Sequence, residues 1–177
     1  MIERFKDLKE VQMIIFRLGN EEYAVPITNV QEIIMPQTPT HIPRSPSWVE
    51  GVINLRGHII PIIDGKRKFQ LNGQGEIQIN SRIIVLDVEP EIVGLIVDEV
   101  SEVIHLKTED IEPPPIDMEE DSDFLWGVGK YHNRLLILID PQRFLSHTES
   151  HDLKKIAKVT EAINQAKENM ELKQVKA

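Results

Sequence analysis

The sequence predicts an all-β protein in which a duplicated unit forms two related β-barrels, followed by a C-terminal helix. Short runs rich in Val and Ile are separated by Pro and Gly over most of the 177 residues, which is typical of strands of roughly five to eight residues. Two stretches of sequence recur in the same order and at similar spacing. Residues 151–177 contain no Pro or Gly and place apolar residues at helical spacing.

Turn-forming residue pairs divide the β body into hairpins. Gly19-Asn20, Arg56-Gly57 and His132-Asn133 each lie between apolar runs and favour tight turns, so the flanking strands are expected to be antiparallel. Ten strands are predicted, at residues 11–18, 22–25, 30–35, 51–55, 58–63, 82–88, 92–97, 100–106, 126–131 and 134–139.

The repeated stretches indicate an internal duplication. Residues 24–34 align without gaps on residues 94–104, and both stretches end in Val-x-Glu-[Ile/Val]-Ile. Residues 51–64 align in the same way on residues 127–140, and both contain a hairpin that closes on an aspartate. Chance similarity between common strand patterns is the alternative. We favour duplication because a lone hairpin cannot bury its apolar face and a pair of equivalent barrels can.

Two connections between predicted strands are unusual in composition. Residues 36–46 contain four prolines, which cannot donate ladder hydrogen bonds and therefore predict an extended surface segment. Residues 108–123 contain eight acidic residues, no basic ones and three consecutive prolines, which predict a solvated loop with a polyproline stretch. Each connection could contact a partner or serve only as a linker.

The last 27 residues predict an amphipathic helix of about twenty residues. Leu153, Ile156, Ile163 and Met170 form its apolar stripe. Ser146 with Glu149 three residues later could form a capping box, and Ser150 is an alternative start. The stripe could dock on the barrels, pair with another chain or remain free; we expect docking on the same chain.

Composition excludes several classes of function. The net charge of −9, from 29 acidic and 20 basic residues, repels nucleic acid and anionic lipid. The absence of cysteine removes disulfides and cysteine-based zinc sites and suits a reducing compartment. The charged N-terminus and the lack of a long apolar run predict a cytoplasmic protein with no direct membrane insertion.

No familiar catalytic or metal-binding motif is present. The six histidines are scattered, which predicts no metal or other cofactor. Gly65-Lys66 lacks the remainder of a phosphate-binding loop, and Lys66-Arg67-Lys68 is expected to be a solvated basic triplet. A hydrolase that uses loop carboxylates remains an alternative. A binding role is favoured, with Arg56 at a hairpin tip either as an interface hot spot or as a charge that keeps the edge soluble.

Four segments carry a resemblance to a known family. Residues 16–27, 30–33, 51–64 and 94–100, and above all the motif Gly-Val-x-Asn-Leu-Arg-Gly at 51–57, resemble the bacterial CheW chemotaxis coupling proteins over about residues 11–147. The resemblance implies two intertwined five-stranded SH3-like barrels in residues 1–150, with residues 151–177 as a helical tail. It also implies a non-catalytic adaptor, monomeric when free, that links chemoreceptor signalling tips to the regulatory domain of the histidine kinase CheA at receptor arrays.

One alternative stays open, a CheW-like scaffold in a pathway other than chemotaxis. The resemblance also assigns candidate sites. A barrel-to-barrel contact with the kinase, of the kind that assembles rings in receptor arrays, is implied for Ile111, Glu112, Pro113, Pro114, Pro115 and Ile116. Glu112 stands where some relatives have a basic residue, and Gly65 replaces a usual leucine, which predicts a weak or shifted helix at residues 66–69. The receptor- and kinase-binding groove is expected to involve Val30, Glu32, Gly51, Asn54, Leu55, Arg56 and Gly57.

Overall fold

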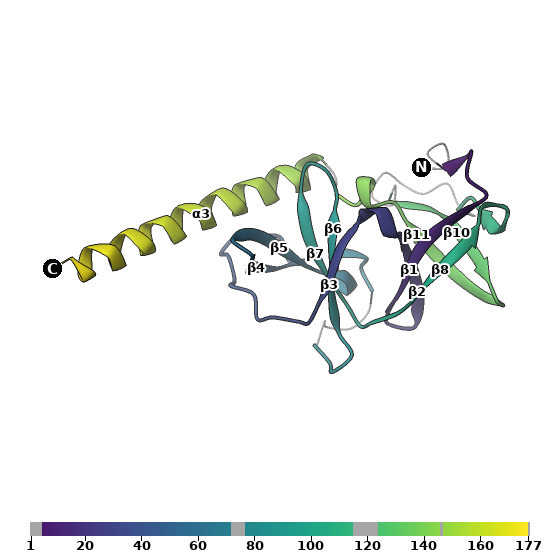
Figure 1. Ribbon diagram of the computed structural model, residues 1–177, viewed down its shortest axis with the longest axis horizontal. Coiled ribbons are helices and arrows are strands. Elements are labelled where there is room, and N and C mark those ends of the chain that lie inside the picture. Colours follow the sequence, from purple (N-terminus) through teal and green to yellow (C-terminus); the bar gives the residue numbers. More distant parts are fainter. Residues whose placement is uncertain (1–4, 72–76, 115–123, 146, 177) are drawn as a thin grey trace.

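Two curved β-sheets lie side by side, and one long helix extends away from them (Figure 1). The computed structural model describes residues 5–71, 77–114, 124–145 and 147–176. The helices are the short α2 (Gly65–Lys68), the long α3 (His147–Val175) and the 3-10 turns η1 (Ile27–Asn29), η2 (Thr108–Asp110) and η4 (Pro141–Arg143). The strands are β1 (Glu10–Leu18), β2 (Glu21–Pro26), β3 (Val30–Ile34), β4 (Val49–Leu55), β5 (His58–Asp64), β6 (Arg82–Asp87), β7 (Ile92–Val97), β8 (Glu99–Lys107), β9 (Ile111–Glu112), β10 (Leu125–Tyr131) and β11 (Arg134–Ile139).

Each sheet takes strands from both halves of the sequence. Sheet A has the order β8-β1-β2-β11-β10-β9, and sheet B has the order β3-β6-β7-β5-β4. The chain therefore crosses from sheet A to sheet B between β2 and β3, and from sheet B back to sheet A between β7 and β8. This exchange of β3 and β8 is what makes the two SH3-like barrels intertwined, as predicted.

The two sheets correspond strand by strand, which confirms the duplication. β8, β1, β2, β11 and β10 occupy the places in sheet A that β3, β6, β7, β5 and β4 occupy in sheet B. Each sheet contains one parallel pair, and its register follows the repeat, since Leu138 pairs with Ala24 in sheet A and Ile62 pairs with Gly94 in sheet B. The structure also places bulges at equivalent positions, between Val49 and Gly51 and between Leu125 and Gly127.

The aspartates that close the repeated hairpins have the same structural role. The Asp64 carboxylate accepts hydrogen bonds from the backbone N–H groups of Lys66 at 3.0 Å and Arg67 at 3.4 Å, and so caps α2. The Asp140 carboxylate accepts from the N–H of Gln142 at 3.0 Å and caps η4. Both aspartates are buried, which explains why the sequence retains an acid at the end of each hairpin.

One local feature differs from the sequence predictions, and a second is shifted as predicted. Ile111–Glu112 adds a sixth strand, β9, to sheet A, because its backbone pairs with β10 before Pro113 ends the ladder. The short helix forms at Gly65–Lys68, one residue before the 66–69 range and so shifted as predicted, because Asp64 caps it. Gly65 also permits close packing there, since an added Cβ would lie 2.7 Å from the Ile96 carbonyl oxygen.

The largest apolar core lies between the two sheets. Side chains from sheet A, including Phe16 and Leu18, meet side chains from sheet B, including Ile84 and Leu95. A smaller core fills each barrel, one around Met13 and the other around residues 53, 60, 62, 83, 85 and 96. The barrels are therefore joined by a broad apolar interface as well as by the two chain crossovers.

Tyr23 gives this central core a dependence on pH. Burial, and secondarily the charge of Glu21, raises the pKa of the Tyr23 phenol above its ordinary value. The folded state therefore holds this proton more tightly, so its contribution to stability is complete below the unfolded pKa and is lost as pH rises through the folded pKa. We expect the free energy of unfolding to decrease above about pH 10, and to do so less steeply in Tyr23→Phe. Denaturant midpoints over this range provide the measurement, and equal slopes would contradict the assignment.

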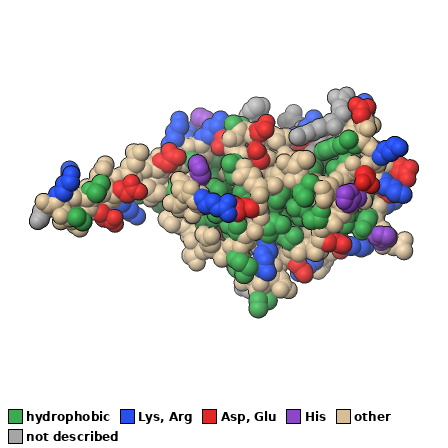
Figure 2. All heavy atoms as spheres, viewed as in Figure 1, with side chains coloured by type: hydrophobic (Ala, Val, Ile, Leu, Met, Phe, Trp, Pro, Cys, Tyr) green, Lys and Arg blue, Asp and Glu red, His purple; other side chains and the backbone are tan. Residues whose placement is uncertain are grey.

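Helix α3 is docked in its first half and free in its second. Leu153, Ile156 and Thr160 are buried, and the first two belong to the central core. Ile163 and Met170, which continue the same stripe, are 45% and 64% exposed. The distal part projects beyond sheet B and carries apolar, basic and acidic side chains interspersed (Figures 1 and 2). Docking on the same chain is thus correct for half of the predicted stripe.

The helix begins at His147, four residues before the predicted start of the tail, and Ser146 lies outside the described residues. Ionic contacts help to fix its first turns, from Lys68 Nζ to Glu149 Oε1 at 2.6 Å and from Lys154 Nζ to Glu91 Oε1 at 3.5 Å. Within the described ranges, no helix is both long and apolar enough to span a bilayer.

Equivalent substitutions in the two halves of α3 are expected to differ in effect. Ile156→Val removes one buried methylene and should lower the free energy of unfolding by about 1 kcal/mol. Ile163→Val makes the same change at an exposed position and should stay within about 0.5 kcal/mol of the unmodified chain. Urea denaturation measures both values. Equal losses would show that the distal half is also packed in solution.

Candidate interaction site

The candidate site is built on the tip of the β4–β5 hairpin. Leu55 pairs with His58, leaving Arg56 and Gly57 as a two-residue turn with φ values of +53° and +85°. Two consecutive positive φ angles are characteristic of a type I′ turn, which matches the natural twist of a hairpin. The Asn54 side chain holds the turn, because its Oδ1 accepts a hydrogen bond from the Gly57 N–H at 2.9 Å. Asn54 and Gly57 therefore shape the loop that presents Arg56.

Arg56 is exposed and paired with an acid from the opposite edge of the sheet. Its Nη2 lies 2.9 Å from Glu32 Oε2, and the exposed fractions of the two side chains are 76% and 23%. Glu32 belongs to β3 and Arg56 follows β4, which are the two edge strands of sheet B. The curl of the barrel thus brings together two residues that are 24 positions apart. The guanidinium retains free donor capacity toward a partner because it has five N–H groups.

The remaining predicted site residues lie around this pair at different depths. Leu55 is half-buried and packs on the core of the sheet B barrel. Val30, at the start of β3, is half-buried against the central core. The structure therefore brings Glu32, Asn54, Arg56 and Gly57 together at the tip, with Leu55 beneath them.

Gly51 does not belong to the exposed tip. It is buried near the far end of β4, with a φ angle of +148°, and an added Cβ would lie 2.3 Å from the Thr40 carbonyl oxygen. Thr40 pairs there with Val52 through two backbone hydrogen bonds. Gly51 therefore lets the proline-rich segment pass directly over β4, and any effect of Gly51 on binding must act through this packing.

The second predicted contact segment lies on the other barrel. Ile111 is half-buried against the core of sheet A, and Glu112 is exposed on β9. Glu112 Oε1 lies 2.6 Å from Lys130 Nζ, and this hydrogen bond and charge raise the pKa of the lysine. The acid at this position is therefore paired with a cation. Pro113 and Pro114 follow in the described chain, whereas Pro115 and Ile116 lie outside the described residues.

The prediction of a solvated basic triplet is wrong for Lys66 and Lys68, whereas Arg67 is exposed. Lys66 Nζ lies 3.3 Å from Asp98 Oδ1, and Arg67 Nη1 lies 3.1 Å from Glu50 Oε1. Lys68 pairs with Glu149 and lies over the Trp48 ring, with its Nζ 4.8 Å from the ring centroid. The sequence did not reveal the pairs of Lys66 and Lys68 because Asp98 lies beyond a crossover and Glu149 is 81 positions away along the chain.

The groups at the tip of the β4–β5 hairpin are suited to contacts with another protein. Within the described parts of the chain, no group of three or more His, Asp or Glu side chains is placed to hold a metal ion. The buried carboxylates of Asp64 and Asp140 are used as helix caps. What the hairpin presents to solvent is an arginine on a rigid turn, beside an acid and above an apolar side chain, which is a composition suited to protein recognition.

Comparison with known proteins identifies the family. The model of the CheW-like domain matches residues 12–149. The chain is 40% identical over 148 residues to the chemotaxis protein CheW of Klebsiella aerogenes, covering 83% of this chain and 89% of the relative. It is 36% identical over 141 residues to that of Helicobacter pylori, covering 79% and 85%. A crystal structure of the scaffolding protein TtCheW from Thermoanaerobacter tengcongensis matches with a TM-score of 0.69 and 38% identity, covering 74% of this chain and 89% of that one. The chain therefore belongs to the CheW-like family.

Proposed function

We propose that this protein is a non-catalytic chemotaxis adaptor that couples chemoreceptors to the histidine kinase CheA. The proposal follows from membership of the CheW-like family, whose members include several proteins named for chemotaxis. In this role the chain holds receptor and kinase at fixed relative positions. A conformational change in the receptor can then alter the activity of the kinase. It acts in the cytoplasm, where it is recruited to receptor arrays at the inner face of the membrane.

The observation that carries the proposal is the presentation of Arg56. The turn fixes the backbone, Asn54 fixes the turn, and Glu32 orients the guanidinium, while most of the arginine side chain remains exposed. A partner that supplies a carboxylate or a carbonyl cluster would gain charge-assisted hydrogen bonds at little cost in conformational entropy. We assign this surface to receptor recognition, with Glu32, Leu55 and Arg56 as contact residues.

A second surface, on the barrel of sheet A, is proposed as a further contact with the kinase. It consists of β9 and the start of the polyproline stretch, which is stiff and so loses little entropy on binding. The Glu112–Lys130 pair neutralises the acid of β9 itself, so we expect apolar contacts around Ile111 and the prolines to contribute most there. Surfaces on separate barrels would let the two partners bind at once.

A kinase-coupling assay tests the proposal. CheA and receptor-containing membrane vesicles are mixed with and without this chain, and kinase autophosphorylation is followed with labelled ATP. We expect receptor control of the kinase only when the chain is present. Heat-denatured chain serves as the control. Receptor control that is equal in the absence of the chain would contradict an adaptor role, and a chain that binds neither partner would indicate a CheW-like scaffold of another pathway.

A further inference from the structure

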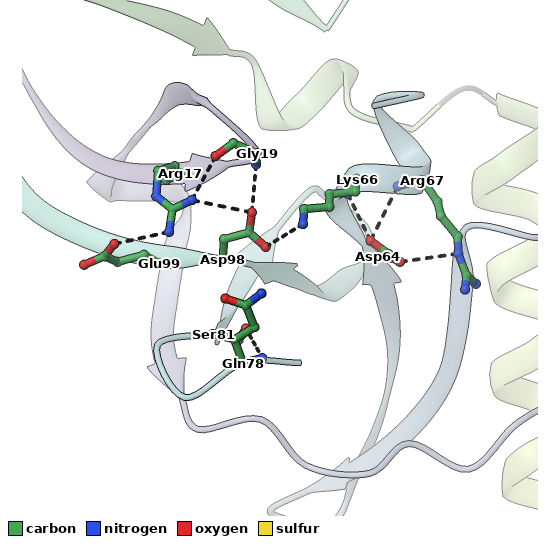
Figure 3. A network of polar contacts seen from close by, with 9 residues as sticks. All are labelled: Arg17, Gly19, Asp64, Lys66, Arg67, Gln78, Ser81, Asp98 and Glu99. Atoms are coloured by element: carbon green, nitrogen blue, oxygen red, sulfur yellow. Dashed lines mark hydrogen bonds and ion pairs between the residues drawn. The ribbon is translucent and has the colours of Figure 1, made fainter. Parts of the chain in front are cut away.

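A polar network connects the two barrels at the crossover between β7 and β8 (Figure 3). Asp98, between these strands, lies at its centre. Its Oδ2 accepts a hydrogen bond from the Gly19 N–H at 2.7 Å and lies 3.9 Å from Arg17 Nη1, and both of these residues belong to the β1–β2 hairpin of sheet A. Its Oδ1 lies 3.3 Å from the Nζ of Lys66, which belongs to α2 beside sheet B. One carboxylate therefore binds both barrels.

The network is shielded from solvent more than ordinary surface ion pairs. The side chains of Lys66 and Asp98 are only 15% and 14% exposed. Leu18 of β1 packs directly against α2 at the same place, because an added Cβ on Gly65 would lie 2.9 Å from a Leu18 methyl carbon. A partly buried ion pair is a weak source of net stability, but its directional contacts can select one arrangement of the groups that it joins.

The equivalent crossover lacks this ionic arrangement. By the repeat alignment, Thr28 stands in the place of Asp98 and Gln142 in the place of Lys66. The hydrogen bond there from Asn29 Nδ2 to the Asp87 carbonyl oxygen, at 3.3 Å, corresponds in the repeat to the Glu99–Arg17 pair and not to the contacts of Asp98. Duplication alone therefore does not account for the Asp98 network. Because the Asp98 network is present at only one of the two crossovers, it indicates a structural role that is specific to the β7–β8 crossover.

We infer that Asp98 and Lys66 are positioning residues that fix the angle between the two barrels. The apolar interface between the sheets is broad but non-directional, so it holds the barrels together without selecting one angle. The charged contacts of Asp98 supply that selection. Because the proposed partner surfaces lie on different barrels, this angle also sets the relative placement of receptor and kinase. That last consequence rests on the proposed function, whereas the effect on the barrels does not.

Distance measurements on the free protein test the inference directly. The chain has no cysteine, so Gln12→Cys on β1 and Ile92→Cys on β7 place one spin label on each barrel at exposed positions. We expect Asp98→Asn to at least double the width of the inter-label distance distribution. Lys66→Met, which removes the same link from the opposite barrel and keeps its apolar stem, should give the same broadening.

Glu99→Gln is the matched control. It removes a charge from the same network, but Glu99 pairs with Arg17 at 3.4 Å inside sheet A and makes no link to sheet B. Its distance distribution should equal that of the labelled parent. Unchanged widths in both Asp98→Asn and Lys66→Met, with folding confirmed by circular dichroism, would overturn the inference.

Binding measurements separate this inference from the proposed function. Asp98→Asn should keep each pairwise affinity, for the kinase regulatory domain and for the receptor tip, within twofold, and should weaken the ternary complex at least fivefold. Equal ternary affinity despite broadened distances would overturn the link between barrel angle and assembly. If the unmodified chain forms no ternary complex, the proposed function fails, while the distance widths still decide whether Asp98 positions the barrels.

Discussion

Replacement of Gly51 by valine should destabilise the protein by roughly 4 kcal/mol or leave it unfolded. Two costs combine at this position. The φ angle of +148° is rarely adopted by residues with a side chain, and a Cβ would lie 2.3 Å from the Thr40 carbonyl oxygen and 2.7 Å from its carbon. The obstructing atoms are backbone atoms held by two hydrogen bonds to Val52, so they cannot rotate away. Denaturant unfolding of the purified variant measures the loss.

Gly57→Ala is the matched control for this prediction. Gly57 also has a positive φ angle, of +85°, but nothing lies within 4 Å of an added Cβ. Only the backbone cost remains, which should be about 1 kcal/mol. A Gly51→Val variant as stable as Gly57→Ala would mean that the proline-rich segment does not pass over β4 as described.

Replacement of Arg56 by alanine should leave the fold intact and weaken binding to at least one partner by about 2 kcal/mol, or roughly thirtyfold. The side chain is exposed, so its loss removes little packing. It does remove a guanidinium whose position is already fixed by the turn and by Glu32, and fixed anchors contribute most to affinity. Titration calorimetry with the kinase regulatory domain and the receptor tip gives the change in affinity for each partner.

His132→Ala provides a control with the same backbone cost. His132 occupies the equivalent tip of the β10–β11 hairpin, and its φ angle of +44° is close to the +53° of Arg56. Both residues already hold a Cβ in the left-handed region, so alanine adds little backbone cost at either position, and both variants should stay close to the unmodified chain in stability. If the two variants bind both partners equally well, Arg56 is not part of the contact surface.

Sequence patterns predicted the strands well because most of them are short, continuous runs of buried Val, Ile and Leu bounded by turn residues. The duplication could also be found in the sequence, because both repeats keep the residues that cap a turn or allow a close backbone approach. Asp64 and Asp140 each cap a turn, and Gly51 and Gly127 each admit a crossing backbone, from Thr40 and from Glu112 respectively. Features of this kind can be predicted from the sequence, because local backbone geometry restricts which residue type can occupy the position.

Ion pairs between segments that are far apart in the sequence could not be predicted in this way. The Lys66–Asp98 pair joins residues 32 positions apart across a crossover, and Lys68 finds Glu149 only after α3 has docked. A lysine that is going to be shielded looks the same in a sequence as one that will be solvated. The same limit applies to α3, whose apolar stripe extends to Met170 even though the body of the protein covers only the part up to Thr160.

An adaptor must hold two proteins at once, and a competition titration distinguishes this from binding one partner at a time. The receptor tip is titrated into the chain alone and into the preformed complex of the chain with the kinase regulatory domain, and binding is followed by calorimetry. We expect one-to-one binding in both titrations, with no kinase domain released. Displacement of the kinase domain by the receptor tip would contradict it, because the two partners would then share a single surface.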